Sequence, residues 1–232
     1  MLRVYPDQVP ILHRLLQNKD MLRISGYVNR EGSTLTSSGR HKASAKSADA
    51  FKEFAPKLYD FYRVRMDELM ESDEGLRPPY LDSVFACTAF NFGPQVVSTP
   101  HRDHLNLAYG WCSITAFGDF DHKAGGHLVL PDLKLAIEFP AGSTILIPSA
   151  LFTHYNVPIG LQETRRSITQ FSAGGIFRWI NYGFQLKRVA TATSVKGQKW
   201  WDKGEGLYTI WPTDDTEAEA EELGCRRNTE SG

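Results

Sequence analysis

The residues best suited to chemistry are a histidine and an aspartate two positions apart, His101 and Asp103. Pro100 disfavours a helical backbone at the residue before it, which favours an extended chain through this stretch. Side chains two apart in an extended chain project from the same face, so the imidazole and the carboxylate could bind one cation. A second histidine from elsewhere would complete a triad of two histidines and one carboxylate. Such a triad leaves positions open on Fe(II) for a co-substrate and dioxygen.

His154 is the candidate for that second histidine. It lies within the apolar stretch 151–158, far enough downstream of His101 to leave room for several intervening strands. A single histidine among apolar neighbours is usually a core residue. Its place after the His-x-Asp motif is therefore what makes it a candidate ligand.

An arginine pair follows the second histidine. A dicarboxylate co-substrate that chelates iron through its keto-acid end needs a cation at its far end, and the planar guanidinium of arginine matches a carboxylate. Arg165 and Ser167 share a strand face and could reach the same carboxylate, whereas Arg166 would face the other way. A bulge in this strand would reverse the choice between the two arginines.

The elements that must position these residues are predominantly strands. After residue 80, short apolar runs alternate with Gly and Pro in a pattern typical of a sandwich or barrel. A double-stranded β-helix, or jelly roll, suits an internal metal site because side chains from several strands line its mouth. The predicted strands cover residues 84–90, 112–117, 127–130, 133–139, 143–147, 152–157 and 167–171.

The residues before the strands favour helices. Apolar residues at helical spacing predict helices at 7–18 and 50–72, with Pro56 in the first turn of a second helical piece. Residues 31–49 are rich in Ser, Ala and Gly and locally basic, which predicts a mobile loop. This loop is either a solvated linker or a contact for phosphate groups.

The predicted fold is α+β and mainly β, with a double-stranded β-helix core and N-terminal helices packed on one sheet. The predicted divisions are an N-terminal extension of the same domain at 1–79, the core at 80–185 and a C-terminal extension at 186–232. The end of the last division is acidic, and we expect it to be disordered.

Composition narrows the functional classes. The 232 residues carry a net charge of −1, which argues against a polycationic clamp on nucleic acid as a whole-protein property. Cys87, Cys112 and Cys225 form no paired framework, which indicates a reducing compartment. No apolar run has the length of a membrane span, and we predict an intracellular, nuclear protein.

The order of motifs resembles the Fe(II)/2-oxoglutarate-dependent dioxygenases. More narrowly, it resembles their TET and J-base-binding-protein (JBP) branch, including its compact fungal members associated with mobile elements. The resemblance covers about residues 80–185. It is carried by HRDxxN at 101–106 followed by Gly110, GGxLxLP at 125–131, a glycine before the apolar strand at 143–147, His154, and RxS at 165–167.

The resemblance implies that His101, Asp103 and His154 bind Fe(II), that Arg165 and Ser167 bind 2-oxoglutarate, and that O2 is the oxidant. The implied substrate is a methylated base in DNA, with 5-methylcytosine first and N6-methyladenine second, flipped out of the duplex to reach the iron. Two other classes stay open. One is a dioxygenase acting on a protein side chain or small molecule, and the other is an inactive jelly-roll binding module of a mobile-element protein.

The resemblance also implies substrate contacts. It places Asn106 beside the target base, although an Asx turn at the strand end would equally explain this residue. Phe171 could stack on a base. Animal TET-type members have a histidine where this chain has Ala173, which cannot form a hydrogen bond with a base edge. The basic residues of 31–49 and 187–203 are the predicted phosphate contacts.

Overall fold

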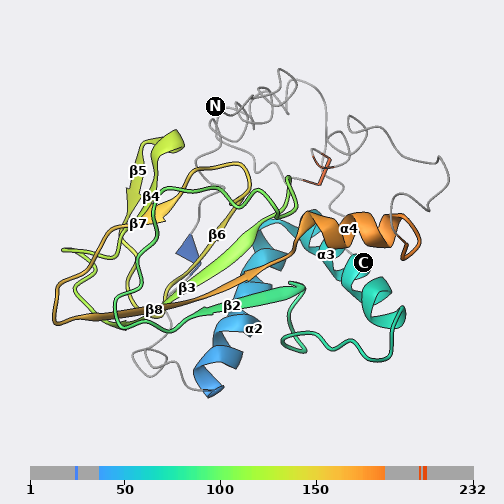
Figure 1. The fold of residues 1–232 in the computed structure, drawn as a ribbon, viewed down its shortest axis with the longest axis horizontal. Helices are drawn as coiled ribbons and strands as arrows, with labels where there is room; N and C mark the ends of the chain where they lie inside the picture. Colours follow the sequence, from blue (N-terminus) through green and yellow to red (C-terminus); the bar gives the residue numbers. More distant parts are fainter. Residues whose placement is uncertain (1–23, 26–36, 186–203, 205, 208–232) are drawn as a thin grey trace, which may run out of the picture.

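The computed structural model describes residues 24–25, 37–185, 204 and 206–207 (Figure 1). The predicted helix at 7–18 and most of the predicted C-terminal extension lie outside these residues. The described elements, in chain order, are β1 (Ile24–Ser25), α2 (Ser37–Phe54), α3 (Pro56–Glu71), β2 (Cys87–Asn91), β3 (Cys112–Asp119), β4 (Leu128–Leu130), η4 (Pro131–Leu133), β5 (Leu135–Ile137), β6 (Thr144–Ile147), β7 (Tyr155–Asn156), β8 (Thr164–Phe171) and α4 (Gly174–Asn181). None of the described helices has the length and hydropathy needed to cross a bilayer.

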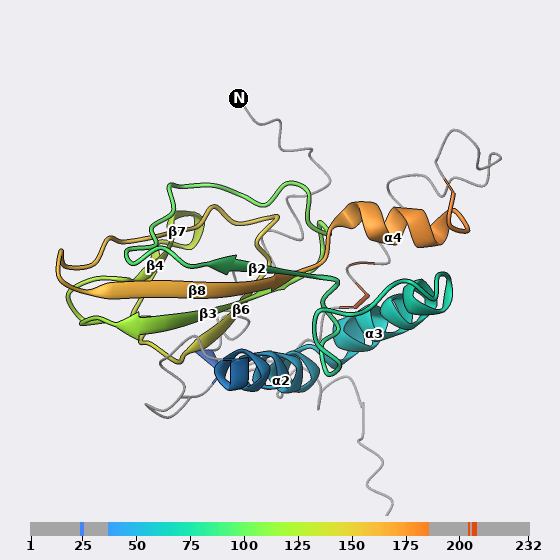
Figure 2. The same ribbon diagram turned by 60° about the horizontal axis from the view of Figure 1, so that its bottom comes forward.

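Two antiparallel sheets form the β region. The larger sheet has the strand order β1-β6-β3-β8-β2, and the smaller has the order β5-β4-β7. Figure 2 shows the smaller sheet on one side of the larger sheet and α2 on the other. The predicted mixture of helices with antiparallel strands is therefore confirmed, while the double-stranded β-helix topology stays a prediction.

Every predicted strand overlaps an observed one, but several boundaries differ. Strand β2 begins at Cys87 rather than at Val84, and β8 begins at Thr164 rather than at Ser167. Strand β7 has only two residues. The predicted helical piece with Pro56 in its first turn is confirmed by α3, which begins at this proline.

The predicted mobile loop at 31–49 is wrong for residues 37–49, which form the first part of α2. Its small residues allow the helix to approach the larger sheet closely, and Ala43 and Ser47 are buried there. Ser113 of β3 donates a hydrogen bond to Ser47 at 2.7 Å, and Gln170 of β8 donates one to Ser44 at 3.0 Å. Ala is a strong helix former, and its abundance here outweighs the loop-like Ser content.

An aromatic cluster joins the helices to the end of the β region. Phe51 of α2 stacks on Phe85 and on Trp111, with ring centroids 5.4 and 5.7 Å apart. Phe61 of α3 stacks on Phe177 of α4 at 5.4 Å. These buried rings fix the helices against one end of the larger sheet.

Candidate metal centre and anion pocket

The segments that carry the two candidate histidines are paired with each other. The backbone N–H of His101 donates to the carbonyl oxygen of His154 at 3.1 Å, and the reverse bond is 2.9 Å long. Asp103 is held by its own N–H, which donates to the carbonyl oxygen of Ser149 at 3.0 Å. As a result, ligand atoms of His101, Asp103 and His154 all lie within 4.8 Å of one another, a group that could hold a metal ion.

Backbone carbonyls fix the tautomers of both rings. Nδ1 of His101 lies 2.8 Å from the carbonyl oxygen of Thr99, and Nδ1 of His154 lies 3.0 Å from that of Phe152. A carbonyl only accepts, so each Nδ1 carries the hydrogen and each Nε2 keeps a free lone pair. The Nε2 atoms lie 3.7 and 3.9 Å from the two carboxylate oxygens of Asp103. Two imidazole nitrogens and one carboxylate suit Fe(II) and related divalent ions.

Burial keeps His154 neutral. Desolvation lowers the pKa of its imidazole below 6.5, the nearby positive form of His101 lowers it further, and the Phe152 carbonyl and Asp103 act in the opposite direction. The deprotonated nitrogen that a metal needs is thus the stable form at neutral pH. His101 is exposed and Asp103 half-buried, so the triad opens to solvent on their side.

Asn106 makes direct contact with the triad. Its amide nitrogen donates to a carboxylate oxygen of Asp103 at 3.2 Å and to the hydroxyl oxygen of Ser149 at 3.1 Å. The side chain also lines the cavity described below. Its two predicted roles, beside a base or in a turn, stay predictions, and the structure adds an orienting contact with the carboxylate.

A cavity of about 300 Å³ lies beside the triad. Its wall includes the three triad residues together with Arg165, Ser167 and Phe171. The β8 residues in this wall occupy alternate positions, as strand geometry requires. The structure therefore places Arg165 in the cavity and Arg166 on the opposite face of β8, where it pairs in register with Phe117.

Arg165 is a buried cation without a carboxylate partner among the described residues. Its exposed fraction is 3%. One terminal nitrogen donates a long hydrogen bond of 3.3 Å to the carbonyl oxygen of Val96, and Nε is buried with no acceptor. Burial lowers the pKa of the guanidinium to about 10, so the group stays charged at neutral pH. Because an unpaired buried charge is costly, an anion bound in the cavity would stabilise this guanidinium.

Two cavity residues were missed by the sequence reasoning. Asn91 of β2 donates its amide to the hydroxyl oxygen of Ser167 at 2.9 Å. Asn156 accepts hydrogen bonds from the backbone and hydroxyl of Ser98, both at 2.9 Å, and so fixes a segment of the cavity wall. For Asn156, the sequence offered one signal: it lies two positions after His154, so in an extended chain both side chains point to the same face.

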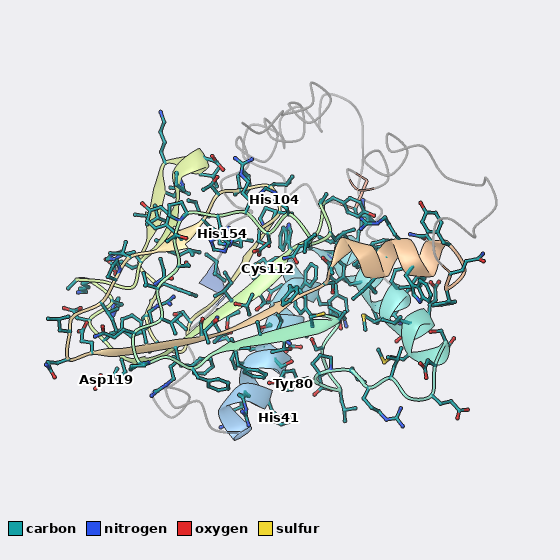
Figure 3. The ribbon with its side chains drawn as sticks, viewed as in Figure 1. His41, Tyr80, His104, Cys112, Asp119 and His154 are labelled. Atoms are coloured by element: carbon teal, nitrogen blue, oxygen red, sulfur yellow. The ribbon has the colours of Figure 1, made fainter. Side chains whose placement is uncertain are left out.

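Two of the other described histidines have partners elsewhere. His41 packs edge-on against Tyr80 with ring centroids 5.3 Å apart, on the α2 side of the larger sheet, well away from His154 (Figure 3). His122 lies 3.7 Å from a carboxylate oxygen of Glu138. Within the described part of the chain, the triad is the group of this kind that could hold a metal.

Neither a protein-family model nor a curated protein matches the sequence. Among solved structures, the chain is similar to NgTET1 in complex with 5mC DNA, with 15% identity over 72% of this chain and 69% of that one and a TM-score of 0.37. It is also similar to a viral collagen prolyl hydroxylase from Paramecium bursaria Chlorella virus 1 in complex with 2OG. There the identity is 14% over 48% of this chain and 70% of that one, with a TM-score of 0.27.

Proposed function

We propose that this chain is an Fe(II)- and 2-oxoglutarate-dependent dioxygenase that oxidises a methylated base in DNA, 5-methylcytosine first and N6-methyladenine second. One observation carries the reaction class. A triad of two histidines and an aspartate shares a cavity with a buried guanidinium that has no acid partner among the described residues. A metal site and an anion site in one small cavity suit a co-substrate that chelates at one end and is negatively charged at the other.

His101, Asp103 and His154 would hold the metal. Both Nε2 atoms present lone pairs, and the hydrogen bonds from Nδ1 to backbone carbonyls fix the ring orientations. When bound, Fe(II) with O2 and 2-oxoglutarate supplies the oxidising chemistry, and the co-substrate leaves as succinate and carbon dioxide. The chain itself positions the groups and shields them from water.

Arg165 and Ser167 would bind the distal carboxylate of 2-oxoglutarate. The Ser167 hydroxyl oxygen already accepts a hydrogen bond from Asn91, so its own hydrogen is available for a carboxylate. Arg165 offers a buried Nε–H that lacks an acceptor. Charge-assisted hydrogen bonds to a dicarboxylate would satisfy both groups at once.

The choice of substrate rests on the motif resemblance and on two residues of the cavity wall. Phe171 can stack on a planar base, and Asn106 offers a polar amide near the triad. Ala173 lies next to Asn106, with which it forms an isolated bridge, and has no polar side-chain atom. Hydrogen bonds to a base edge would therefore come from Asn106 rather than from residue 173. A nuclear location stays a prediction.

The test combines two readouts on the same samples. Protein is incubated with Fe(II), ascorbate, 2-oxoglutarate and a duplex carrying either methylated base, and succinate and oxidised nucleosides are measured by mass spectrometry. Asp103→Ala should abolish both products. Asp119→Ala, an exposed carboxylate at the far end of β3, is the matched control and should retain both (Figure 3).

Each possible failure has a distinct meaning. Wild-type succinate production by Asp103→Ala would refute the assigned metal site. Succinate without base oxidation, combined with turnover on a peptide or small molecule, would refute only the DNA substrate. Neither iron binding nor succinate formation by the wild-type protein would indicate a binding module instead of an enzyme.

A further inference from the structure

Three polar side chains form a closed ring next to the triad, on residues that take no part in it. One terminal nitrogen of Arg102 lies 3.0 Å from a carboxylate oxygen of Asp132, and its Nε donates to the hydroxyl oxygen of Thr153 at 3.0 Å. The same oxygen of Asp132 accepts the backbone N–H of Thr153 at 2.7 Å. The ring therefore ties together three segments that are distant in sequence.

The position of this ring relative to the triad is set by sequence adjacency. Arg102 lies between His101 and Asp103, and Thr153 immediately precedes His154. Neighbouring side chains in extended backbone point to opposite faces. The ligand side chains therefore converge on the cavity, while Arg102 and Thr153 meet each other outside it; neither belongs to the cavity wall.

The third member of the ring is held by a short helical turn. Asp132 lies in η4 (Pro131–Leu133), which is followed by Lys134, a residue with a positive φ of 56°. The proline fixes the first backbone angle of the turn, and the left-handed residue ends it. The carboxylate thus extends from a short constrained connection between β4 and β5.

Few backbone hydrogen bonds join the two histidine segments. His101 and His154 pair through an isolated bridge of two hydrogen bonds outside the named strands, and the N–H of Asp103 adds one to the carbonyl oxygen of Ser149. A bound ion needs its ligands within about 0.2 Å of their ideal distances. Extra side-chain links across the bridge would hold the two imidazoles closer to that requirement.

We propose that Arg102, Asp132 and Thr153 form a positioning clamp that sets the metal affinity of the triad. This inference rests on the proposed function, because it assumes that the triad binds a divalent ion. Arg102 is suited to the task because its fork donates to two partners at once, which a lysine cannot do in the same geometry. The side chains of Arg102 and Asp132 are 26% and 29% exposed, so solvent screens the pair and it adds little to global stability.

The clamp predicts a larger effect on metal binding than on folding. The dissociation constant for Co²⁺ is measured by calorimetry without 2-oxoglutarate, the Co²⁺ absorption spectrum is recorded, and the melting temperature is measured without metal. Arg102→Met should weaken Co²⁺ binding about 10-fold or more, the usual effect of removing a partner that orients metal ligands. The Co²⁺ affinity of Arg102→Lys should lie between those of the wild type and Arg102→Met. The metal-free melting temperature of both variants should change little.

Arg63→Met is the matched control. Arg63 of α3 also pairs with an aspartate, Asp67, at 3.3 Å, but on an exposed helix surface away from the cavity. It should bind Co²⁺ as the wild type does. Thr153→Val provides a second test, because it removes the hydroxyl acceptor of Arg102 and keeps the backbone bond to Asp132; it should weaken binding several-fold.

The outcomes separate the clamp from the metal site. Wild-type Co²⁺ affinity in Arg102→Met would overturn the clamp, and if that variant does not fold, wild-type affinity in Thr153→Val would do the same. A purely structural role would lower the metal-free melting temperature and leave the Co²⁺ spectrum and affinity of the folded protein unchanged, which also overturns it. If the wild type binds no Co²⁺, or if His154→Ala binds it equally well, the metal site itself is refuted and the clamp with it.

Discussion

Replacing Arg165 by Met should stabilise the metal-free, ligand-free protein while weakening its response to 2-oxoglutarate. Arg165 is almost completely buried, has no carboxylate partner among the described residues and leaves Nε without an acceptor. An apolar side chain of similar length removes an uncompensated charge from the interior. The same change removes the donor that we assign to the distal carboxylate of the co-substrate.

The structure gives the size of both effects. The pKa of Arg165 falls from 12.5 to about 10 through burial, which corresponds to about 3 kcal/mol of lost solvation. Part of this is offset by the 3.3 Å hydrogen bond to Val96 and by the ring of Phe139, whose centroid lies 5.9 Å from the guanidinium carbon. A net gain of about 1–2 kcal/mol is expected, within the range seen when buried charges are replaced by apolar groups.

For a chain of this length, such a gain raises the melting temperature by about 2–4 °C per kcal/mol. The loss of ligand binding is larger, because a hydrogen bond to a charged group contributes about 1.5–3 kcal/mol, or roughly 10- to 150-fold in the dissociation constant. Saturating 2-oxoglutarate at about 100 times its dissociation constant should stabilise the wild type by about 2.7 kcal/mol.

Thermal unfolding with and without 2-oxoglutarate, in the presence of Mn²⁺ and without O2, measures both effects in one experiment. Arg165→Met should unfold at a higher temperature than the wild type without ligand, and the same ligand concentration should stabilise it by only about 0.3–1.4 kcal/mol. Arg166→Met is the control, because Arg166 lies on the other face of β8, and it should keep the wild-type shift. A variant at 165 that unfolds earlier than the wild type and still shows the full ligand shift would refute the anion site.

Three further predictions concern stability and reactivity. Burial lowers the pKa of His154 in the native protein below 6.5, so as the pH drops below 6.5 the unfolded chain takes up a proton at this residue before the native protein does. The metal-free free energy of unfolding, measured with urea across pH, should therefore fall below pH 6.5, and it should fall less steeply in His154→Gln. Gly118→Ala should cost more than about 2 kcal/mol, because φ is +123° and a Cβ would overlap the carbonyl of Thr164, whereas Gly183→Ala, with open space, should cost only about 1 kcal/mol in the same assay. Burial raises the pKa of Cys112 to about 12, so this thiol should resist alkylation in native protein and react only after unfolding, as read by peptide mass spectrometry.

The parts of the fold and site that sequence reasoning could reach are those governed by local rules. Alternation of side chains along a strand favoured Arg165 over Arg166, and the structure places only Arg165 in the cavity wall. Alternation also predicted that His101 and Asp103 share a face, and their ligand atoms lie together. Pro56 marked the beginning of α3 because proline is suited to the first helical turn. Each of these inferences needs only neighbours in sequence.

The parts that could not be predicted depend on contacts between distant segments. The start of α2 looked like a loop because its small polar residues carry no apolar periodicity, and the hydrogen bonds that bury Ser44 and Ser47 come from strands far away in sequence. Asp132 has no motif of its own, and its contact with Arg102 depends on where η4 lies in space. Asn91 reaches Ser167 only because β2 pairs with β8.

The anion end and the metal end of the cavity differ in how the backbone fixes them, and this difference predicts which substitutions should change ligand affinity at each end. Arg165 lies on β8, where it is paired with Gly118 of β3 on one side and bridged to Gln95 on the other. The anion end is therefore fixed by continuous backbone pairing, and only changes to the side chains that contact the anion should alter its affinity. The metal end instead joins two segments through one isolated bridge and a single backbone hydrogen bond from Asp103 to Ser149, so its geometry depends more on side chains outside the cavity. Affinity for the ion should consequently be sensitive to residues that never touch it.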